Sequence, residues 1–302
     1  MRGYVGVMVV AAMSGCRASP DAEKVFSDPI VGTFDLFEAD DTELAPMMRD
    51  LETQIYVNME VDASDVLKRS VTPGPLAEED VANLKDHPDR DPSVALPIAT
   101  AWASPFDIDQ HATLPVVEDQ TLLEPTSPDH YNREFVEGKD CWVANDCAWL
   151  KTFQDLTKVY TGNIVPPIPY EFYKDFRWVD LNIGLDGATG SRWAYVARSY
   201  NPGSYADEKS GKNTIWASYT IELWFPRDGG GFTWDNAPDG ATPLGDDAGD
   251  STGGGTLRFL SLWTETELTL TDDPNMMAGT IRWGMDQNYK AHDDYLEAQA
   301  TP

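Results

Sequence analysis

The feature that most constrains this chain is a two-residue alternation that runs without interruption over residues 214–225. One side of this segment carries only apolar residues, which are Ile215, Ala217, Tyr219, Ile221, Leu223 and Phe225. The other side is mostly polar, with Trp216 and Trp224 as its apolar exceptions. Successive side chains of a strand point to opposite faces of a sheet, so the pattern predicts a long β-strand with one buried face.

Three neighbouring segments show strand patterns of the same kind. Residues 257–270 follow the first strand, and residues 176–185 and 192–200 precede it, joined by the turn-rich residues 186–190. Consecutive strands with short or glycine-rich connections predict an antiparallel meander. Further upstream, residues 54–61 also alternate, which predicts a fifth strand.

Helical patterns are fewer, and the clearest one lies at the C-terminus. Apolar residues recur there at three- to four-residue spacing, at Met277, Ile281, Met285, Tyr289 and Leu296. This spacing predicts an amphipathic helix, and Pro274 after two aspartates is a typical start signal. Residues 64–69 and 76–84 are expected to form short helices.

The order of these elements resembles the helix-grip order of START-like, or Bet v 1-like, proteins. Residues 55–68 look like the first strand of that family and its turn into the first helix, and the resemblance covers residues 54–298. It implies that the last helix lies across a curved sheet and encloses an apolar cavity. Residues 103–160 have no counterpart in that order. We therefore expect an α+β fold, an antiparallel meander with a C-terminal amphipathic helix; the alternative is a β-barrel or sandwich with peripheral helices.

The N-terminus has the pattern of an export signal. Residues 4–13 carry no charge and lead into Met13-Ser14-Gly15-Cys16, which resembles the lipobox of bacterial lipoproteins. The resemblance implies cleavage of a signal peptide, residues 1–15, and attachment of lipid to the sulfur of Cys16. Arg17 in place of aspartate favours the outer membrane. We expect residues 16–28 to be a tether, residues 29–302 to be a single β-rich domain, and the protein to be lipid-anchored in the cell envelope.

Two further cysteines, Cys141 and Cys147, are separated by five residues. In an exported chain such a pair is typical of a disulfide that closes a small loop. The alternative is a metal site, but no histidine lies nearby and the spacing is longer than usual for zinc ligands. We therefore favour the disulfide.

Charge and motif content exclude several classes of function. The chain carries 22 basic and 51 acidic residues, a net charge of −29, so we expect no nucleic-acid partner. It contains no zinc-hydrolase His-Glu-x-x-His motif and no phosphate-binding Gly-x-x-x-x-Gly-Lys loop. We therefore expect no catalytic residues, no enzyme activity and no cofactor.

Two acidic segments are weak candidates for metal binding. Asp107, Asp109 and His111 would project to one side if this segment were extended, although chance supplies such triplets in an aspartate-rich chain and a solvated loop is favoured. Residues 227–255 contain nine glycines and six aspartates and are expected to form a long hairpin loop. Its carboxylates are candidates for weak calcium binding.

Two functional hypotheses follow. The first is a lipid or other hydrophobic ligand in a cavity under the C-terminal helix, lined by Tyr219, Ile221, Leu223, Phe225 and Met285. The second is a structural or interaction protein of the envelope, in which these residues form a solid core.

Two arginines lie on predicted strands and could face the interior of the protein. Arg177 and Arg198 need buried carboxylate partners if they face inward, because an unpaired buried charge is costly. The alternative is that they receive an amphipathic anion in an aromatic cavity.

The lipobox interpretation is tested at Cys16. We expect Cys16→Ser to abolish lipid attachment, because the serine hydroxyl cannot replace the sulfur that carries the lipid, and to leave a soluble or uncleaved product. Metabolic labelling with a radioactive fatty acid measures this, with wild type as the reference. Lipid labelling that survives the substitution contradicts the prediction.

Overall fold

The strands found in the described part of the chain form one nine-stranded antiparallel sheet. The computed structural model describes residues 29–58, 69–71, 73–159, 165–227, 255–269 and 273–300. The strands are β1 (Arg69–Val71), β2 (Leu96–Ser104), β3 (Tyr131–Glu137), β4 (Trp149–Lys158), β5 (Ile168–Asp180), β6 (Trp193–Tyr200), β7 (Tyr205–Ala206), β8 (Thr214–Pro226) and β9 (Thr256–Glu267). Their order is β1-β2-β9-β8-β6-β5-β4-β3, and β7 pairs with β8.

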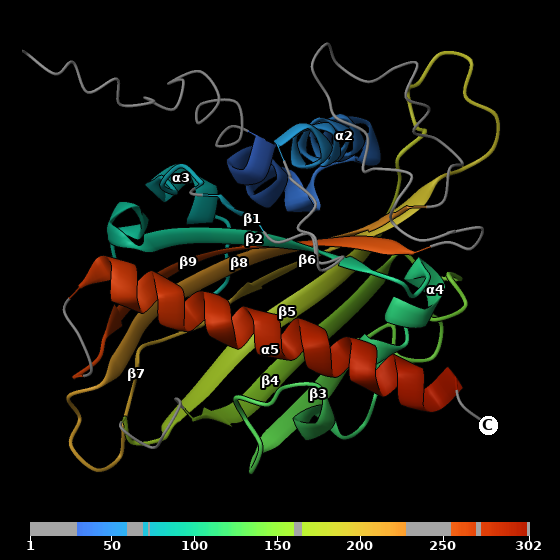
Figure 1. The fold of residues 1–302 in the computed structure, drawn as a ribbon. Helices are drawn as coiled ribbons and strands as arrows, with labels where there is room; N and C mark the ends of the chain where they lie inside the picture. The colour runs from blue at the N-terminus through green and yellow to red at the C-terminus, as the bar shows by residue number, and fades with distance from the viewer. Residues whose placement is uncertain are drawn as a thin grey trace, which may run out of the picture.

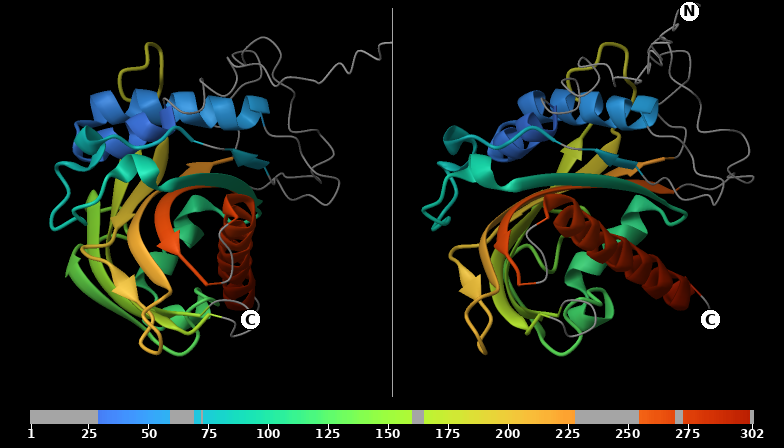
Figure 2. Two further views of the ribbon diagram at one scale, coloured as in Figure 1. Left: turned by 90° about the vertical axis from the view of Figure 1, so that its left-hand side faces the viewer. Right: turned by 60° about the vertical axis from the view of Figure 1, so that its left-hand side comes forward.

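Helices cover both faces of this sheet. They are η1 (Leu36–Glu38), α2 (Asp41–Asn58), α3 (Glu78–Val81), η2 (Pro92–Val94), α4 (Ile108–His111), η3 (Leu114–Val116), η4 (Gln120–Leu122) and α5 (Pro274–Ala300), and residues 29–35 are also helical. The long helix α5 crosses the concave face, and α2 lies on the opposite face (Figure 1). Figure 2 shows the sheet curling around α5.

The expected fold class is confirmed. The meander β5-β6-β8-β9 and the C-terminal helix α5 both form, so the fold is α+β with an antiparallel sheet. Strand β5 begins at Ile168, earlier than predicted. The pairing of β8 with β9 runs to Pro226 opposite Thr256, which makes residues 227–255 a hairpin connection.

Some predictions fall outside the described residues. These are the signal peptide and tether of residues 1–28, including Cys16, and residues 228–254 with their calcium candidates. Within the described ranges, no helix combines the length and apolar composition needed to cross a bilayer.

The strand predicted over residues 54–61 is wrong, because residues 54–58 belong to helix α2. The alternation at Ile55 and Val57 coincides with a helical stripe that begins earlier. Leu44, Met48, Leu51 and Ile55 recur at helical spacing and are all fully buried. The helical spacing therefore decides the structure, and residues 59–61 are not among those described.

Other boundaries also differ from expectation. The helix predicted over 76–84 forms only as the single turn α3, and Arg69 at the end of the helix predicted over 64–69 belongs to strand β1; residues 64–68 are not described. Residues 103–160 are more than an insertion, because they supply β3 and β4 at one edge of the sheet.

The face of the sheet under α2 carries the main apolar core. Fully buried residues of β8 and β9 contact residues 29–35, η1 and α2 there. The ring of Phe34 lies edge-on to Tyr219 and Trp263, with centroid distances of 6.3 and 5.5 Å. Such contacts add to the free energy gained by burying aromatic area.

Buried arginines of the sheet hold this helical layer through ion pairs. Arg177 pairs with Asp41 and donates to the carbonyl of Phe37 at 2.7 Å. Arg198 pairs with Glu38. Both arginines therefore have carboxylate partners from the N-terminal segment, but these partners are not buried as predicted, because the Asp41 side chain is partly exposed and that of Glu38 is 61% exposed.

A third arginine makes a two-pronged pair with helix α2. Arg192 Nη1 and Nη2 donate to the two carboxylate oxygens of Glu52 at 2.8 and 2.5 Å, and Glu52 is only 2% exposed. This fork geometry is the strongest form of an arginine–carboxylate contact.

Loss of the Glu52 charge should destabilise the protein. We expect Glu52→Gln to lower the free energy of unfolding by about 3 kcal/mol, because it leaves the Arg192 charge without its buried counter-charge. Urea denaturation measures the change. Glu43→Gln is the control, since Glu43 lies exposed on the same helix and its loss should cost less than about 0.5 kcal/mol. Equal effects of the two substitutions contradict the prediction.

Candidate functional site

A cavity of about 230 Å³ lies between helix α5 and the sheet; we call it the first chamber. Its sheet wall includes Lys174, Ser199, Thr220 and Leu262, which are opposed in register across β5, β6, β8 and β9. Its apolar lining includes Ile215, Leu260, Leu268, Met277, Ile281 and Met285. The chamber is thus mainly apolar, with a few polar groups on the sheet side.

A smaller cavity of about 90 Å³, the second chamber, adjoins the first. The two share lining residues, which are Glu124, Tyr131, Lys174, Glu222, Leu260, Met285 and Asn288. Aromatic side chains from four strands form part of its wall, and the rings of Tyr195 and Trp224 stack with centroids 4.4 Å apart. The combined space therefore has one apolar part and one aromatic, polar part.

The charges where the chambers meet are paired. Lys174 of β5 forms an ion pair with Glu222 of β8, and Lys158 Nζ lies 2.8 Å from Glu124 Oε1. Burial raises the pKa of Glu124, but the Lys158 charge and hydrogen bonds from Lys158, Thr126 and Asn288 outweigh it and lower the pKa to about 2. These two lysines and two carboxylates therefore cancel one another.

The second chamber is surrounded by buried polar atoms that have no hydrogen-bond partner among the described residues. They are His111 Nδ1, Arg133 Nε, Tyr195 OH, Trp224 Nε1, Asn288 Oδ1, Tyr289 OH and His292 Nδ1. A buried polar atom without a partner costs about 1–3 kcal/mol, so such atoms are rare in folded proteins. Because several such atoms surround one cavity, this cavity is suited to hold the polar groups of a bound molecule.

Helix α5 is held over the chambers by a buried charge. Arg258 of β9 is fully buried and donates to Asp293 Oδ2 at 2.8 Å and to the carbonyl of Tyr289 at 3.2 Å. Its guanidinium also lies over the Tyr289 ring, 4.6 Å from the centroid. These contacts set where α5 crosses the sheet.

Both histidines of the second chamber are uncharged at neutral pH. Burial and the nearby Arg258 charge lower the pKa of His292 from 6.5 to about 3. Burial also lowers the pKa of His111 well below its ordinary value, and Arg258 and His292 add to this. The chamber therefore presents neutral imidazoles.

Of the residues predicted to line a cavity, the structure places only Met285 there, in both chambers. Tyr219, Ile221, Leu223 and Phe225 lie on the opposite face, in the core under α2. These residues lie there because both faces of β8 are covered. Its apolar side packs against α2, and its more polar side faces the chambers. Sequence reasoning missed the lining residues Ser218, Thr220 and Glu222.

The triplet Asp107, Asp109 and His111 does not form a site. The segment turns into α4 instead of being extended, so residues two apart point in different directions. Asp107 and Asp109 are exposed, whereas His111 is fully buried with its Nε2 2.8 Å from Ser104 Oγ. No group of three or more histidine, cysteine or acidic side chains in the described ranges is placed to hold a metal ion.

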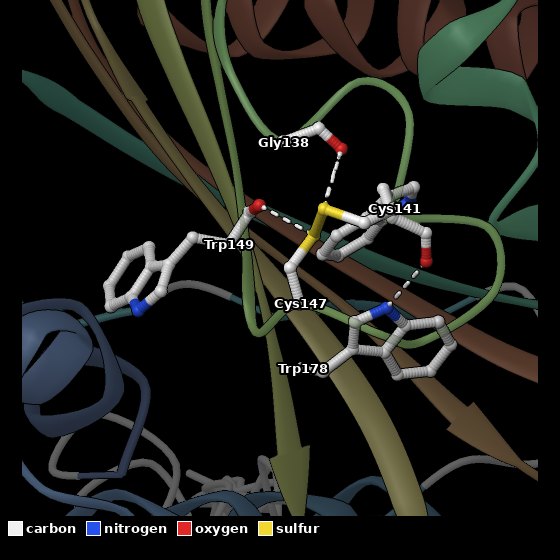
Figure 3. Close-up of a disulfide and its surroundings, with 6 residues drawn as sticks. Gly138, Cys141, Cys147, Trp149 and Trp178 are labelled. Carbon is white, nitrogen blue, oxygen red and sulfur yellow. Dashed lines mark hydrogen bonds between the residues drawn. A yellow bond between two sulfur atoms is a disulfide. The ribbon is translucent and has the colours of Figure 1, made fainter.

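The predicted disulfide between Cys141 and Cys147 is confirmed, with a Cα–Cα distance of 5.5 Å. Figure 3 shows the two sulfur atoms beside the carbonyl oxygens of Gly138 and Trp149, at 3.6 and 3.5 Å. Within the loop, the carbonyl of Trp142 accepts a hydrogen bond from Trp178 Nε1. The bridge therefore fixes a loop beside the aromatic cluster around Trp142, which includes Tyr195 and Trp224 of the second chamber.

Comparisons with known proteins give only distant similarities. No protein-family model matches the chain, and no curated protein matches it. Among solved structures it is similar to TTHA0849 from Thermus thermophilus, at 13% identity over 68% of this chain and 99% of that one, with a TM-score of 0.32. It is also similar to Ara h 8.0201, at 13% identity over 67% and 97%, with a TM-score of 0.30. At this distance neither structure bears on ligand or activity.

The lowered pKa of His292 should make stability depend on pH. Unfolded His292 takes up a proton near pH 6.5, but the folded protein resists it until about pH 3. Its contribution to stability is thus complete above pH 6.5 and is lost as the pH falls toward 3. We expect His292→Gln to reduce the slope of unfolding free energy against pH by about 1.4 kcal/mol per pH unit between about pH 5.5 and 4. Urea denaturation across this range measures the slope, and equal slopes in both proteins contradict the prediction.

Proposed function

We propose that this protein binds a hydrophobic small molecule with a polar end in the two chambers beneath helix α5. The single observation that carries the proposal is the pair of adjoining cavities, one mainly apolar and one lined by unpartnered polar atoms. Ligand sites in proteins are typically concave and mostly apolar, with a few placed polar groups. A solid core would leave no such space.

In this proposal, the first chamber binds the hydrocarbon part of the ligand and the second chamber binds its polar end. The apolar lining of the first chamber, from Leu260, Met277, Ile281 and Met285, removes hydrocarbon from water. Such burial contributes roughly 25 cal/mol per Å² of apolar area. The second chamber then satisfies the polar end of the molecule and fixes its orientation.

We further propose that the protein carries out this binding at the cell envelope, anchored in the outer membrane by lipid on Cys16. The lipobox-like sequence before Cys16 supports this location. The disulfide between Cys141 and Cys147 also supports it, because disulfides persist in oxidising compartments outside the cytoplasm. A protein anchored in this way keeps its chambers close to a source of apolar molecules.

Filling the first chamber should block ligand binding. Gly284 of α5 lines this chamber, and a Cβ there lies 3.8 Å from the Thr126 methyl group, which is an ordinary contact. We expect Gly284→Leu to lower the affinity for N-phenyl-1-naphthylamine, a neutral fluorescent apolar probe, at least tenfold. The helix itself should gain stability, because leucine has a higher helix propensity than glycine. Fluorescence titration of full-length protein measures the affinity.

Gly279→Leu is the matched control. Gly279 lies on the same helix, is exposed, and has open space where a Cβ would be. It gains the same helix propensity without entering the chamber, so probe affinity should not change. Failure of the wild-type protein to bind the probe, or equal affinity in all three proteins, contradicts the proposal and favours a structural or interaction protein.

A further inference from the structure

The hydrogen bonds around the second chamber determine which atoms donate and which accept. Ser104 Oγ donates to Asp293 Oδ1 at 2.8 Å, and the other oxygen of Asp293 accepts from Arg258. A hydroxyl group has one proton, so His111 Nε2, 2.8 Å from Ser104 Oγ, must be the donor in its contact with the serine. The neutral imidazole then has no proton on Nδ1. His111 Nδ1 is therefore an unpartnered acceptor at the chamber wall.

A second acceptor is oriented in the same way. Asn288 Nδ2 donates to Glu124 Oε1 at 2.7 Å, which sets the direction of the amide. Asn288 Oδ1 is buried without a partner, and Asn288 lines both chambers. The wall of the second chamber thus carries two bare acceptors from two different elements.

Lys174 at this wall is paired with Glu222, and the donors left without a partner among the described residues are single N–H groups. The indole of Trp224 can only donate, through Nε1. Arg133 directs its terminal nitrogens to the carbonyl of Pro115, to Tyr131 OH and to Gln154 Oε1, so that among the described residues only Nε is left without a partner. A carboxylate therefore cannot form the two-pronged contact that arginine usually makes with it.

Two tyrosine hydroxyls complete the set. Tyr195 and Tyr289 are 0% and 2% exposed, and their hydroxyls have no partner among the described residues. A hydroxyl can donate or accept, so these two groups adapt to whatever the ligand presents.

Building on the proposed ligand-binding function, we propose that the second chamber holds an uncharged hydroxyl group of the ligand and discriminates against a carboxylate in the same place. A hydroxyl can donate to His111 Nδ1 or Asn288 Oδ1 and accept from Trp224 Nε1 at the same time. A carboxylate only accepts, so it leaves both acceptors unpaired and faces their lone pairs.

Among the described cations around the second chamber, only Arg133 has no carboxylate partner, and it leaves only its Nε without a hydrogen-bond partner. The positive charge of Lys174 is neutralised by Glu222, and that of Lys158 by Glu124. Lys174 and Glu222 both line the second chamber, so this ion pair adds no net positive charge to it. The imidazoles of His111 and His292 are neutral and add no positive charge.

A matched pair of ligands tests this preference. 1-Decanol and decanoate share the same hydrocarbon length and differ in the polar end, and at pH 7.5 the carboxylic acid is ionised. We measure how each displaces N-phenyl-1-naphthylamine from the full-length protein. Decanol is expected to bind at least tenfold more tightly than decanoate. Equal or tighter binding of decanoate overturns the inference and shows that Arg133 dominates the chamber.

Variants that remove only an unpartnered hydroxyl test the location. Tyr195→Phe and Tyr289→Phe should weaken decanol binding about threefold to tenfold, while affinity for the apolar probe stays unchanged and the urea midpoint stays the same or rises. Tyr219→Phe is the control, because the Tyr219 hydroxyl is also buried and unpartnered but lies in the core under α2. It should leave decanol binding unchanged.

The outcomes separate this inference from the proposed function. Probe binding without a preference for decanol, or an unchanged decanol-to-decanoate ratio in both tyrosine variants, overturns the hydroxyl inference and leaves ligand binding intact. If the probe, decanol and decanoate all fail to bind, the proposed function falls and the inference falls with it.

Discussion

One buried charge organises the half of the molecule that contains the chambers. Arg258 is fully enclosed and needs a counter-charge, because an unpaired guanidinium in a protein interior is costly. Asp293 supplies it from α5, and this pair fixes where the helix crosses the sheet. Asp293 also accepts a hydrogen bond from the Ser104 hydroxyl, and the serine oxygen in turn orients His111. The position of the helix and the hydrogen-bonding character of the second chamber therefore depend on the same contact.

Ion pairs also hold the helical layer on the opposite face of the sheet. Its arginines pair with carboxylates from the N-terminal segment, so the helical layer is held by charge as well as by apolar contacts. Breaking the buried pair of Arg192 and Glu52 is expensive, and the three pairs together oppose local detachment of the helical layer. The face of the sheet under α2 is therefore densely packed, whereas the face under α5 borders the two chambers.

The sequence predicted strands β5, β6, β8 and β9 and the last helix because each has a clear period, whereas β2, β3 and β4 were not predicted. The sequence alone could not show which face of β8 borders the cavity. An alternating pattern distinguishes two faces of a strand, but it does not show what packs against each face. Helix α2 was missed because Ile55 and Val57 fit a strand as well as a helix over so short a window. The hydrogen-bonded set of Ser104, His111 and Asp293 has no local signature, because two of its members lie 189 residues apart. The disulfide was found because its two cysteines are neighbours in the chain.

Strand β8 places core residues and chamber residues at alternate positions, and this has a consequence for how such a protein can evolve. From Ala217 to Phe225, odd-numbered positions such as Ile221 decide whether the sheet stays folded against α2, whereas even-numbered positions such as Thr220 decide the shape and polarity of the cavity. Substitution at an even-numbered position alters a wall with free space beside it and leaves the dense core unchanged. The shape and polarity of the cavity can therefore diverge between descendants of this chain by single substitutions, while the same strand preserves a common scaffold.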